Sequence, residues 1–159
     1  MRQDALTVEP TRALGQAIRY EQFGHGADVG VRGFGATASE AFERAAMALF
    51  SLLAEDPSRL GREAEERFEV EAPGLPELLV AFLNELISLA DTKHLVFGDF
   101  RVRIDENPSG SCRLSARARG EPFDAARHRF TVLPKGATYT ALAVGRQDGR
   151  WVAQCVIDV

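Results

Sequence analysis

The chain has 159 residues, of which 45% are hydrophobic and 26% are charged, and its formal net charge is −4. These values are typical of one globular domain, and an acidic chain lacks the clustered basic residues that duplex nucleic acid binding needs. No apolar run approaches the roughly 20 residues of a membrane helix, and residues 1–17 lack the apolar core of a signal peptide. The sequence therefore predicts a cytoplasmic protein without membrane contact, with a loose arm at residues 1–17 before one domain at residues 18–159.

The start of the predicted domain contains a segment that suggests polar chemistry. Residues 18–23 and 29–34 are typical of strands. Between them, His25 and Asp28 lie three residues apart and next to glycines, where the backbone can approach a ligand closely. A turn in which Asp28 accepts backbone N–H groups explains the same pattern, and for so short a motif taken alone it is the favoured interpretation.

Two amphipathic helices are predicted in the middle of the chain. The first, over residues 38–54, begins with the capping-box spacing of Thr37 and Glu40 and then repeats apolar residues at i, i+3, i+4 and i+7. A strand with clean alternation is predicted over residues 68–72. The second helix follows over residues 75–90, and its apolar residues cover most of its circumference. We expect this helix to be the more deeply buried of the two.

The rest of the chain predicts strands only. Alternation bounded by turn residues predicts strands over residues 96–104, 112–118, 130–133, 138–144 and 151–159. The first two of these form a hairpin, and Asp148-Gly149 predicts a tight turn that pairs the last two antiparallel. The predicted fold class is α+β, a single domain in which a mainly antiparallel β-sheet is covered by two amphipathic helices.

Residue types that build zinc cages are too dispersed to predict one. Cys112 and Cys155 are far apart and form no CxxC motif, so free thiols in the core are expected. His25, His94 and His128 are equally dispersed.

Basic residues gather in the C-terminal part of the chain. Residues 101–159 hold 10 Lys and Arg against 6 Asp and Glu, whereas residues 1–100 hold 9 against 17. Arg113, Arg117 and Arg119 have even spacings and would share one strand face, which favours a solvated outer face. These arginines could still touch RNA or an acidic partner. We expect any RNA contact to be indirect.

Four segments together resemble the archease family, whose members are accessory proteins of RNA ligases. They follow one another at family-like separations over nearly the whole predicted domain, and their joint occurrence is fairly specific. The segments are Tyr20-Glu21 with His25 to Val31, Thr37 to Phe50, Asp91-Thr92 with Leu95 to Phe97, and Lys135 to Tyr139 with Val156 to Val159.

The resemblance implies an activator rather than a stand-alone enzyme. Archease-like proteins promote the guanylylation and repeated turnover of a GTP-dependent ligase, which joins RNA ends bearing a 3′-phosphate or cyclic phosphate to a 5′-hydroxyl in tRNA splicing or RNA repair. By matching position, the resemblance implies a metal site at Asp28 and Asp158. It also implies a role for Lys135 in binding.

The implied site makes chemical sense from the residues themselves. Two aspartates offer hard oxygen ligands that suit Ca²⁺, Mg²⁺ or Mn²⁺. Alternation places Asp158 away from the more apolar face of the last strand, where it could share a cation with Asp28. Lys135 lies in a turn between a proline and a glycine, from which its ammonium could meet a phosphate or an acidic ligase surface. His25 is expected either to orient Asp28 or to pack against the sheet.

Three residues depart from the family pattern. The family usually has aspartate and threonine where this chain has Gly24 and Gly26, which could lower metal affinity because fewer oxygens are present. Gly136 replaces a common alanine and should loosen its turn.

Two other functions remain open at this point. One is a small metal-dependent phosphohydrolase that uses Asp28 and Asp158, although most such sites assemble more ligands and the sequence contains no P-loop or nucleophile elbow. The other is a chaperone-like binding domain in which the carboxylates are incidental.

Overall fold

The structure is a computed structural model, and it describes residues 18–130 and 132–159. The arm predicted at residues 1–17 lies outside the described residues. The elements are β1 (Tyr20–His25), β2 (Asp28–Gly35), α1 (Ala38–Phe50), a 3₁₀ turn η3 (Pro57–Arg59), β3 (Ala64–Ala72), α2 (Leu75–Lys93), β4 (Leu95–Glu106), β5 (Cys112–Pro122), β6 (Gly136–Ala137), β7 (Ala143–Gln147) and β8 (Arg150–Asp158). Within the described chain, no helix is both long and apolar enough to cross a membrane.

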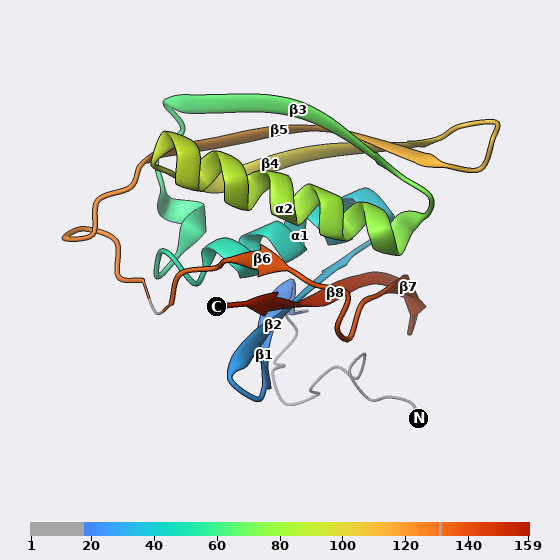
Figure 1. Cartoon of the computed structure of the whole chain (residues 1–159), viewed down its shortest axis with the longest axis horizontal. Coiled ribbons are helices and arrows are strands. Elements are labelled where there is room, and N and C mark those ends of the chain that lie inside the picture. The colour runs from blue at the N-terminus through green and yellow to red at the C-terminus, as the bar shows by residue number, and fades with distance from the viewer. Residues whose placement is uncertain (1–17, 131) are drawn as a thin grey trace.

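The two helices lie between two antiparallel sheets, so the molecule has three layers (Figure 1). One sheet has the strand order β1-β2-β8-β6, with β7 also paired to β8, and we call it the five-stranded sheet. The other has the order β3-β5-β4 and is the three-stranded sheet. The predicted α+β class with antiparallel strands and two helices is confirmed, but the strands divide between two sheets instead of forming one.

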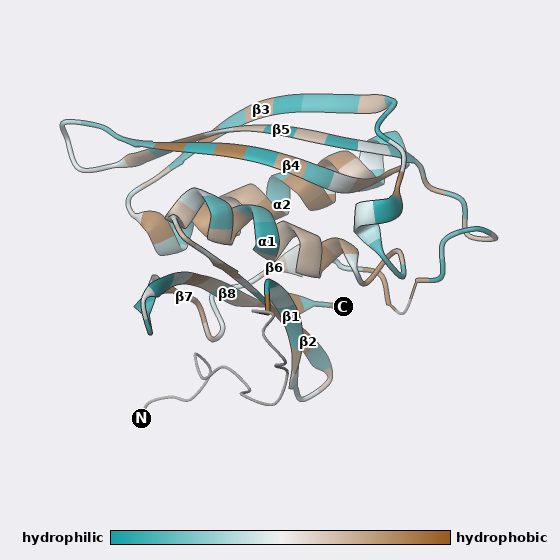
Figure 2. Ribbon diagram, turned by 180° about the vertical axis from the view of Figure 1, so that it is seen from behind, coloured by the Kyte–Doolittle hydropathy of each residue, from teal (hydrophilic) through white to brown (hydrophobic). Residues whose placement is uncertain are grey.

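The burial of α2 explains the division into two sheets. Leu78, Leu79, Phe82, Leu83 and Leu86 are fully buried on α2, and the helix contacts strands of both sheets. A helix that is apolar over most of its circumference needs cover on two sides, which a single sheet cannot supply. The strands show the complementary pattern, with hydrophobic and hydrophilic residues alternating along β4 (Figure 2).

Helix α1 begins at the predicted cap and packs directly onto β2. The Thr37 hydroxyl accepts a hydrogen bond from the Glu40 backbone N–H at 3.1 Å, while the Glu40 carboxylate accepts one from the N–H of Ala36 at 2.7 Å. The helix ends at Phe50, four residues before the predicted end at residue 54, and residues 51–53 continue as turns. Gly33 of β2 allows this close packing, because a Cβ there would clash with the backbone of α1.

The β4–β5 hairpin is present as predicted, with β3 added on the other side of β5. A bulge interrupts β4 at Gly98, where a Cβ would clash with the carbonyl oxygen of Pro57. The outer edge of β4 is partly covered, because the Glu43 carboxylate of α1 accepts a hydrogen bond from the Val102 N–H at 2.8 Å. Burial at this edge raises the pKa of Glu43.

Two of the predicted strands are wrong. Phe130, Val132 and Leu133 lie in no strand, and residues 138–142 separate β6 from β7. Ala141 has a positive φ of 52°, which interrupts an extended chain there. The Asp148-Gly149 turn and the antiparallel pairing of β7 with β8 are confirmed, and both turn residues have the positive φ of a type I′ turn, at 54° and 83°.

A buried pair of polar side chains holds the connection between β5 and β6. His128 Nδ1 accepts a hydrogen bond from the Asp124 N–H at 2.9 Å, so its Nε2–H donates to the Glu121 carboxylate at 2.6 Å. Although burial raises it, hydrogen bonds from Gly61 and His128 and the charge of Arg127 hold the pKa of Glu121 below its usual value. The two cysteines, in contrast, are free and buried, as expected.

We predict that Gly33→Ala destabilises the fold, because the added methyl group meets backbone atoms of α1 that cannot move aside. The free energy of unfolding should fall by about 3 kcal/mol, measured by urea denaturation. Gly145→Ala in β7 is the matched control, since a Cβ there meets nothing within 4 Å. Equal urea midpoints for the two variants would contradict the close packing of α1 on β2.

Candidate functional site

A tight hairpin positions the first of the predicted site residues. His25 and Asp28 pair directly across β1 and β2, with Gly26 and Ala27 as a two-residue turn between them. Gly26 has a positive φ of 62° and Ala27 does not, as in a type II′ turn, which favours glycine at its first central position. Asp28 is therefore held at the first position of β2 by the geometry of the turn.

The C-terminal strand brings the second aspartate to the same place. β2 pairs with β8 in an antiparallel register that matches Val29 with Ile157, so one more step sets Asp28 opposite Asp158. Residues that face each other in antiparallel strands share one side of the sheet, with Cβ atoms about 4.5–5.5 Å apart. Ile157 is fully buried against the helices, so the two aspartates lie on the opposite, outer side of the five-stranded sheet.

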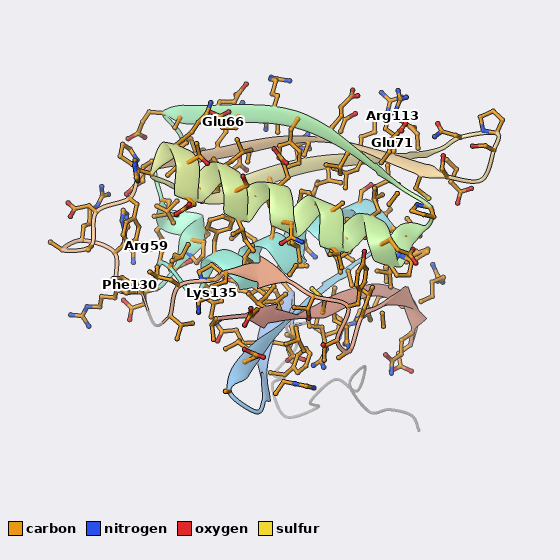
Figure 3. All side chains as sticks on the ribbon, viewed as in Figure 1. Arg59, Glu66, Glu71, Arg113, Phe130 and Lys135 are labelled. Carbon is orange, nitrogen blue, oxygen red and sulfur yellow. The ribbon has the colours of Figure 1, made fainter. Side chains whose placement is uncertain are left out.

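The short strand β6 adds the region of Lys135. Gly136 pairs with Asp158, and the Lys135 N–H donates a hydrogen bond to the Asp158 carbonyl oxygen at 2.7 Å. A row of facing positions thus crosses four strands at one end of the sheet, which we call the aspartate row: His25, Asp28, Asp158 and Gly136. Lys135 lies at the start of β6 beside this row (Figure 3). The structure therefore brings the backbones of Asp28, Asp158 and Lys135 together.

Asn84 of α2 fixes the position of β6. This residue was not among the site residues predicted from the sequence. Its Oδ1 accepts a hydrogen bond from the Ala137 N–H at 2.8 Å, and its Nδ2 donates to the Ala137 carbonyl at 3.2 Å. A polar residue within the apolar pattern of α2 was the available signal. Because Lys135 is two residues from this clamp, Asn84 also limits where its backbone can lie.

The carboxylates of the aspartate row have few partners within the protein. Asp28 is half-buried, and its Oδ1 accepts a long hydrogen bond of 3.4 Å from the Val159 N–H. Asp158 and Lys135 are exposed. His25 is exposed too, and among the described residues its side chain makes no hydrogen bond to Asp28, so neither of its expected roles is supported.

The aspartate row differs from the row of Arg32, which lies two rows further along the same side of the sheet. Arg32 of β2 faces Glu21 on one side and Gln154 on the other, forms an ion pair with Glu21 and donates a hydrogen bond to Gln154 Oε1 at 2.9 Å. Its charge is thus compensated within the sheet. Asp28 and Asp158 instead place two like charges opposite each other, which is unfavourable unless a cation lies nearby.

The donor set fits a hard cation held by few protein ligands. Within residues 18–130 and 132–159, no group of three or more His, Cys, Asp or Glu side chains lies close enough to hold a metal ion. Two carboxylates remain, and both keep oxygens that accept no hydrogen bond from the part of the chain that the structure describes. Ca²⁺, Mg²⁺ and Mn²⁺ accept such oxygens and complete their shells with water, so these residues fit such an ion at modest affinity.

The positions that depart from the family pattern have different geometries. A Cβ at Gly24 or Gly26 meets nothing within 4 Å, and one at Gly136 lies 3.4 Å from Asn84 Oδ1. Gly24 faces Val29, so its side chain position is on the other side of the sheet from Asp28. An aspartate at position 24 would therefore not join the aspartate row directly.

An apolar pocket lies close to Lys135 in the chain. A cavity of about 220 Å³ opens between the C-terminal ends of both helices and the segment that precedes β6. Phe50 lines it from the end of α1 and Leu53 from the turn that follows. Ile87 and Asp91 line it from α2, and Leu133 and Pro134 from that segment. Leu133 is at the same time 56% exposed.

Comparison with known proteins relates the whole described domain to one family. A sequence model of the archease protein family (MTH1598/TM1083) matches residues 20–159. The protein archease of Pyrococcus furiosus is 41% identical over 142 residues, which cover 89% of this chain and 99% of that protein. That of Thermococcus gammatolerans is 44% identical with the same coverage.

Solved structures show the same fold. The solution structure of Methanobacterium thermoautotrophicum protein 1598 superimposes with a TM-score of 0.76 at 30% identity, covering 88% of this chain and 98% of that one. The crystal structure of an archease, described as a possible chaperone, from Thermotoga maritima matches with a TM-score of 0.50 at 17% identity. The second likeness concerns the fold alone.

We predict that Gly26→Thr strains the hairpin that holds Asp28, because a β-branched residue is disfavoured at a φ of 62°. The free energy of unfolding should fall by about 1–2 kcal/mol. Gly24→Thr is the control, since position 24 has space for a side chain and lies in an ordinary strand conformation. Thermal and urea unfolding check the difference, and a Gly26→Thr variant as stable as the control would contradict the type II′ turn.

Proposed function

This chain belongs to the archease family, and we propose that it is an accessory protein that activates a GTP-dependent RNA ligase. The ligase would join RNA ends bearing a 3′-phosphate or cyclic phosphate to a 5′-hydroxyl, in tRNA splicing or RNA repair. In this proposal the protein promotes guanylylation of the ligase and its repeated turnover, acts in the cytoplasm and is not itself an enzyme.

The observation that carries the proposal is the pairing of Asp28 with Asp158 next to Lys135. The two carboxylates would hold a divalent cation, which supplies positive charge at this end of the five-stranded sheet. The Lys135 ammonium adds a second positive charge on a flexible side chain. A positively charged surface of this kind suits the phosphate of a guanylate bound to a ligase. It also suits acidic residues on the ligase itself.

Exposed apolar side chains beside Lys135 support a protein partner. Among the described residues, the large hydrophobic side chains that are exposed are Phe130, Leu133 and Tyr139, at 43%, 56% and 67%. All three lie within a short segment around Lys135, and Phe130 and Lys135 are found at the same end of the molecule (Figure 3). Clustered apolar side chains next to polar ones are typical of protein interfaces.

A chaperone-like role is the second candidate, favoured by the same exposed side chains. The relative from Thermotoga maritima is described as a possible chaperone, and such a role also needs contact with another protein. A metal-dependent phosphohydrolase has less support, because two carboxylates are few for that chemistry.

We predict that Asp28→Asn and Asp158→Asn each weaken Ca²⁺ or Mn²⁺ binding at least tenfold, because each removes one of two anionic ligands. Titration calorimetry measures the affinity. Asp148→Asn is the control, since it makes the same change of charge in the β7–β8 turn, where asparagine also tolerates a positive φ. Unchanged binding in both site variants would exclude the proposed metal site.

We predict that Lys135→Met lowers ligase guanylylation and turnovers per ligase about tenfold or more while cation binding stays unchanged. The assay combines the host's RNA ligase with this protein, GTP, divalent metal and RNA ending in a 2′,3′-cyclic phosphate. Lys93→Met is the control, because that ammonium pairs with Glu66 of the three-stranded sheet at 3.1 Å and such exposed pairs contribute little stability.

The same assay separates the candidate functions. If the wild-type protein raises neither guanylylation nor turnover, the activator proposal is wrong. Phosphate released by the protein without ligase would identify a hydrolase, and protection of unfolded ligase from aggregation without any effect on guanylylation would identify a chaperone.

A further inference from the structure

The outer face of the three-stranded sheet carries almost only charged side chains. This face points away from the helices and lies on the opposite side of the molecule from the outer face of the five-stranded sheet (Figure 1). Arg113 and Glu71 extend from it into solvent (Figure 3). Its outward positions are Glu65, Arg67, Glu69 and Glu71 on β3, Arg113, Ser115, Arg117 and Arg119 on β5, and Asp99, Arg101, Arg103 and Asp105 on β4.

The register of the strands arranges these residues in rows, and two of the rows are electrically compensated. In both, an arginine of β5 faces an acidic residue on each neighbouring strand: Glu65, Arg119 and Asp99 in one, and Glu71, Arg113 and Asp105 in the other. Arg119 Nε lies 3.2 Å from Glu65, and Arg113 Nη2 lies 3.0 Å from Glu71. Opposite charges across strands stabilise a sheet in this way.

Between these rows, three arginines face one another. Arg117 of β5 pairs with Arg67 of β3 on one side and with Arg101 of β4 on the other. We call these three residues the arginine row. Arg103 follows in the next row, with 79% of its side chain exposed. Like charges directly opposite each other destabilise a sheet, and no acidic residue occupies any position of this row.

Neighbouring acids compensate the arginine row only in part. Arg67 Nε pairs with Glu65 at 2.8 Å, but Glu65 also serves Arg119. Arg117 reaches Asp99 only at 3.7 Å, and its Nε is shielded from solvent without a hydrogen-bond partner. Among the described residues Arg101 forms no salt bridge within 4.0 Å. The row thus has guanidinium donors to spare.

We propose that the arginine row binds a terminal phosphate group. A guanidinium fork matches the oxygens of a phosphate, and neighbouring strands lie about 4.8 Å apart, so adjacent forks can reach the same group. The two compensated rows carry two acidic residues each and limit the uncompensated basic strip to the arginine row and the adjoining row of Glu69, Ser115 and Arg103. So narrow a strip disfavours a long polyanionic backbone. The face carries no aromatic residue on which a base could stack, so the phosphate itself is what the site recognises.

Two ligands present such a group, a free nucleotide and an RNA strand that ends in a phosphate. The site is independent of the proposed function, since it shares no residue with the aspartate row and lies on the other outer face. It could therefore hold one end of a phosphorylated ligand while the other face engages a partner.

The test is a binding titration of the full chain at low salt in phosphate-free buffer, with inorganic phosphate, GTP and a five-nucleotide RNA with or without a 3′-phosphate as probes. We expect Arg101→Gln and Arg67→Gln each to weaken phosphate binding at least fivefold. Arg113→Gln, which changes a compensated row, should leave it unchanged. Tighter binding of the phosphorylated RNA than of GTP assigns the site to RNA ends, and the reverse assigns it to nucleotides.

The stability of the Arg101→Gln variant is a second measurement. It distinguishes a binding role of Arg101 from a role in stabilising the fold. Without ligand, Arg101→Gln should unfold at the same or a higher urea concentration than the wild type, because it relieves like-charge repulsion. The proposal is overturned if no probe binds or if the glutamine variants bind as well as the wild type. It is also overturned if both RNAs bind equally and GTP binds no more tightly than they do. Equal competition by a hexaglutamate peptide would also overturn it, since the site would then be a general anion or acidic-protein surface.

Discussion

The antiparallel register between β2 and β8 determines where the candidate site residues of the five-stranded sheet lie. Val31, Cys155 and Ile157 face the helices and are fully buried, so a slip by one residue would expose the core side of both strands. Gly33 adds a second constraint, because α1 packs against backbone where no side chain fits. The apolar core thereby fixes Asp28 opposite Asp158, so the position of the two carboxylates follows from the burial of residues on the other side of the sheet.

The three-layer arrangement has a consequence for function. Because the helices are covered by a sheet on each side, each sheet has an outer face that carries polar groups, such as Asp28 on one and Arg113 on the other. These faces point in opposite directions (Figure 1). The core thiol of Cys155 illustrates the contrast between the layers, since burial raises its pKa to about 12 and leaves it unreactive. Exposed charged side chains lie at strand ends, in turns and on the outer faces, whereas the buried Glu121 carboxylate is compensated by His128 and Arg127.

Local patterns in the sequence were sufficient for most elements but not for their assembly. The N-terminal cap of α1, the Asp148-Gly149 turn and the β4–β5 hairpin depend on residues close in sequence, and they were predicted correctly. The pairing of β3 with β5 depends on contacts about 50 residues apart, so the second sheet could not be predicted. Residues 130–133 have the apolar composition of a strand, yet the Glu121 to His128 pair holds the preceding segment as an irregular connection.

The two sites also depend on residues that are distant in sequence. The strand register is therefore more informative about them than the sequence pattern of any one strand. From the family resemblance, Asp28, Asp158 and Lys135 could be named, but the strand register that sets Asp28 opposite Asp158, with Lys135 beside them, could not be predicted. Arg113, Arg117 and Arg119 could be assigned to one strand face, while Arg67 and Arg101 could not be added.

Among the paired strands that the structure describes, like charges face each other only within the aspartate row and the arginine row. Elsewhere on these outer faces, arginines meet acids, as Arg32 does at Glu21 and Arg113 at Glu71. The two rows of like charges cost stability, whereas other facing charges on these sheets are compensated. A bound ion of opposite charge would remove that cost in each row.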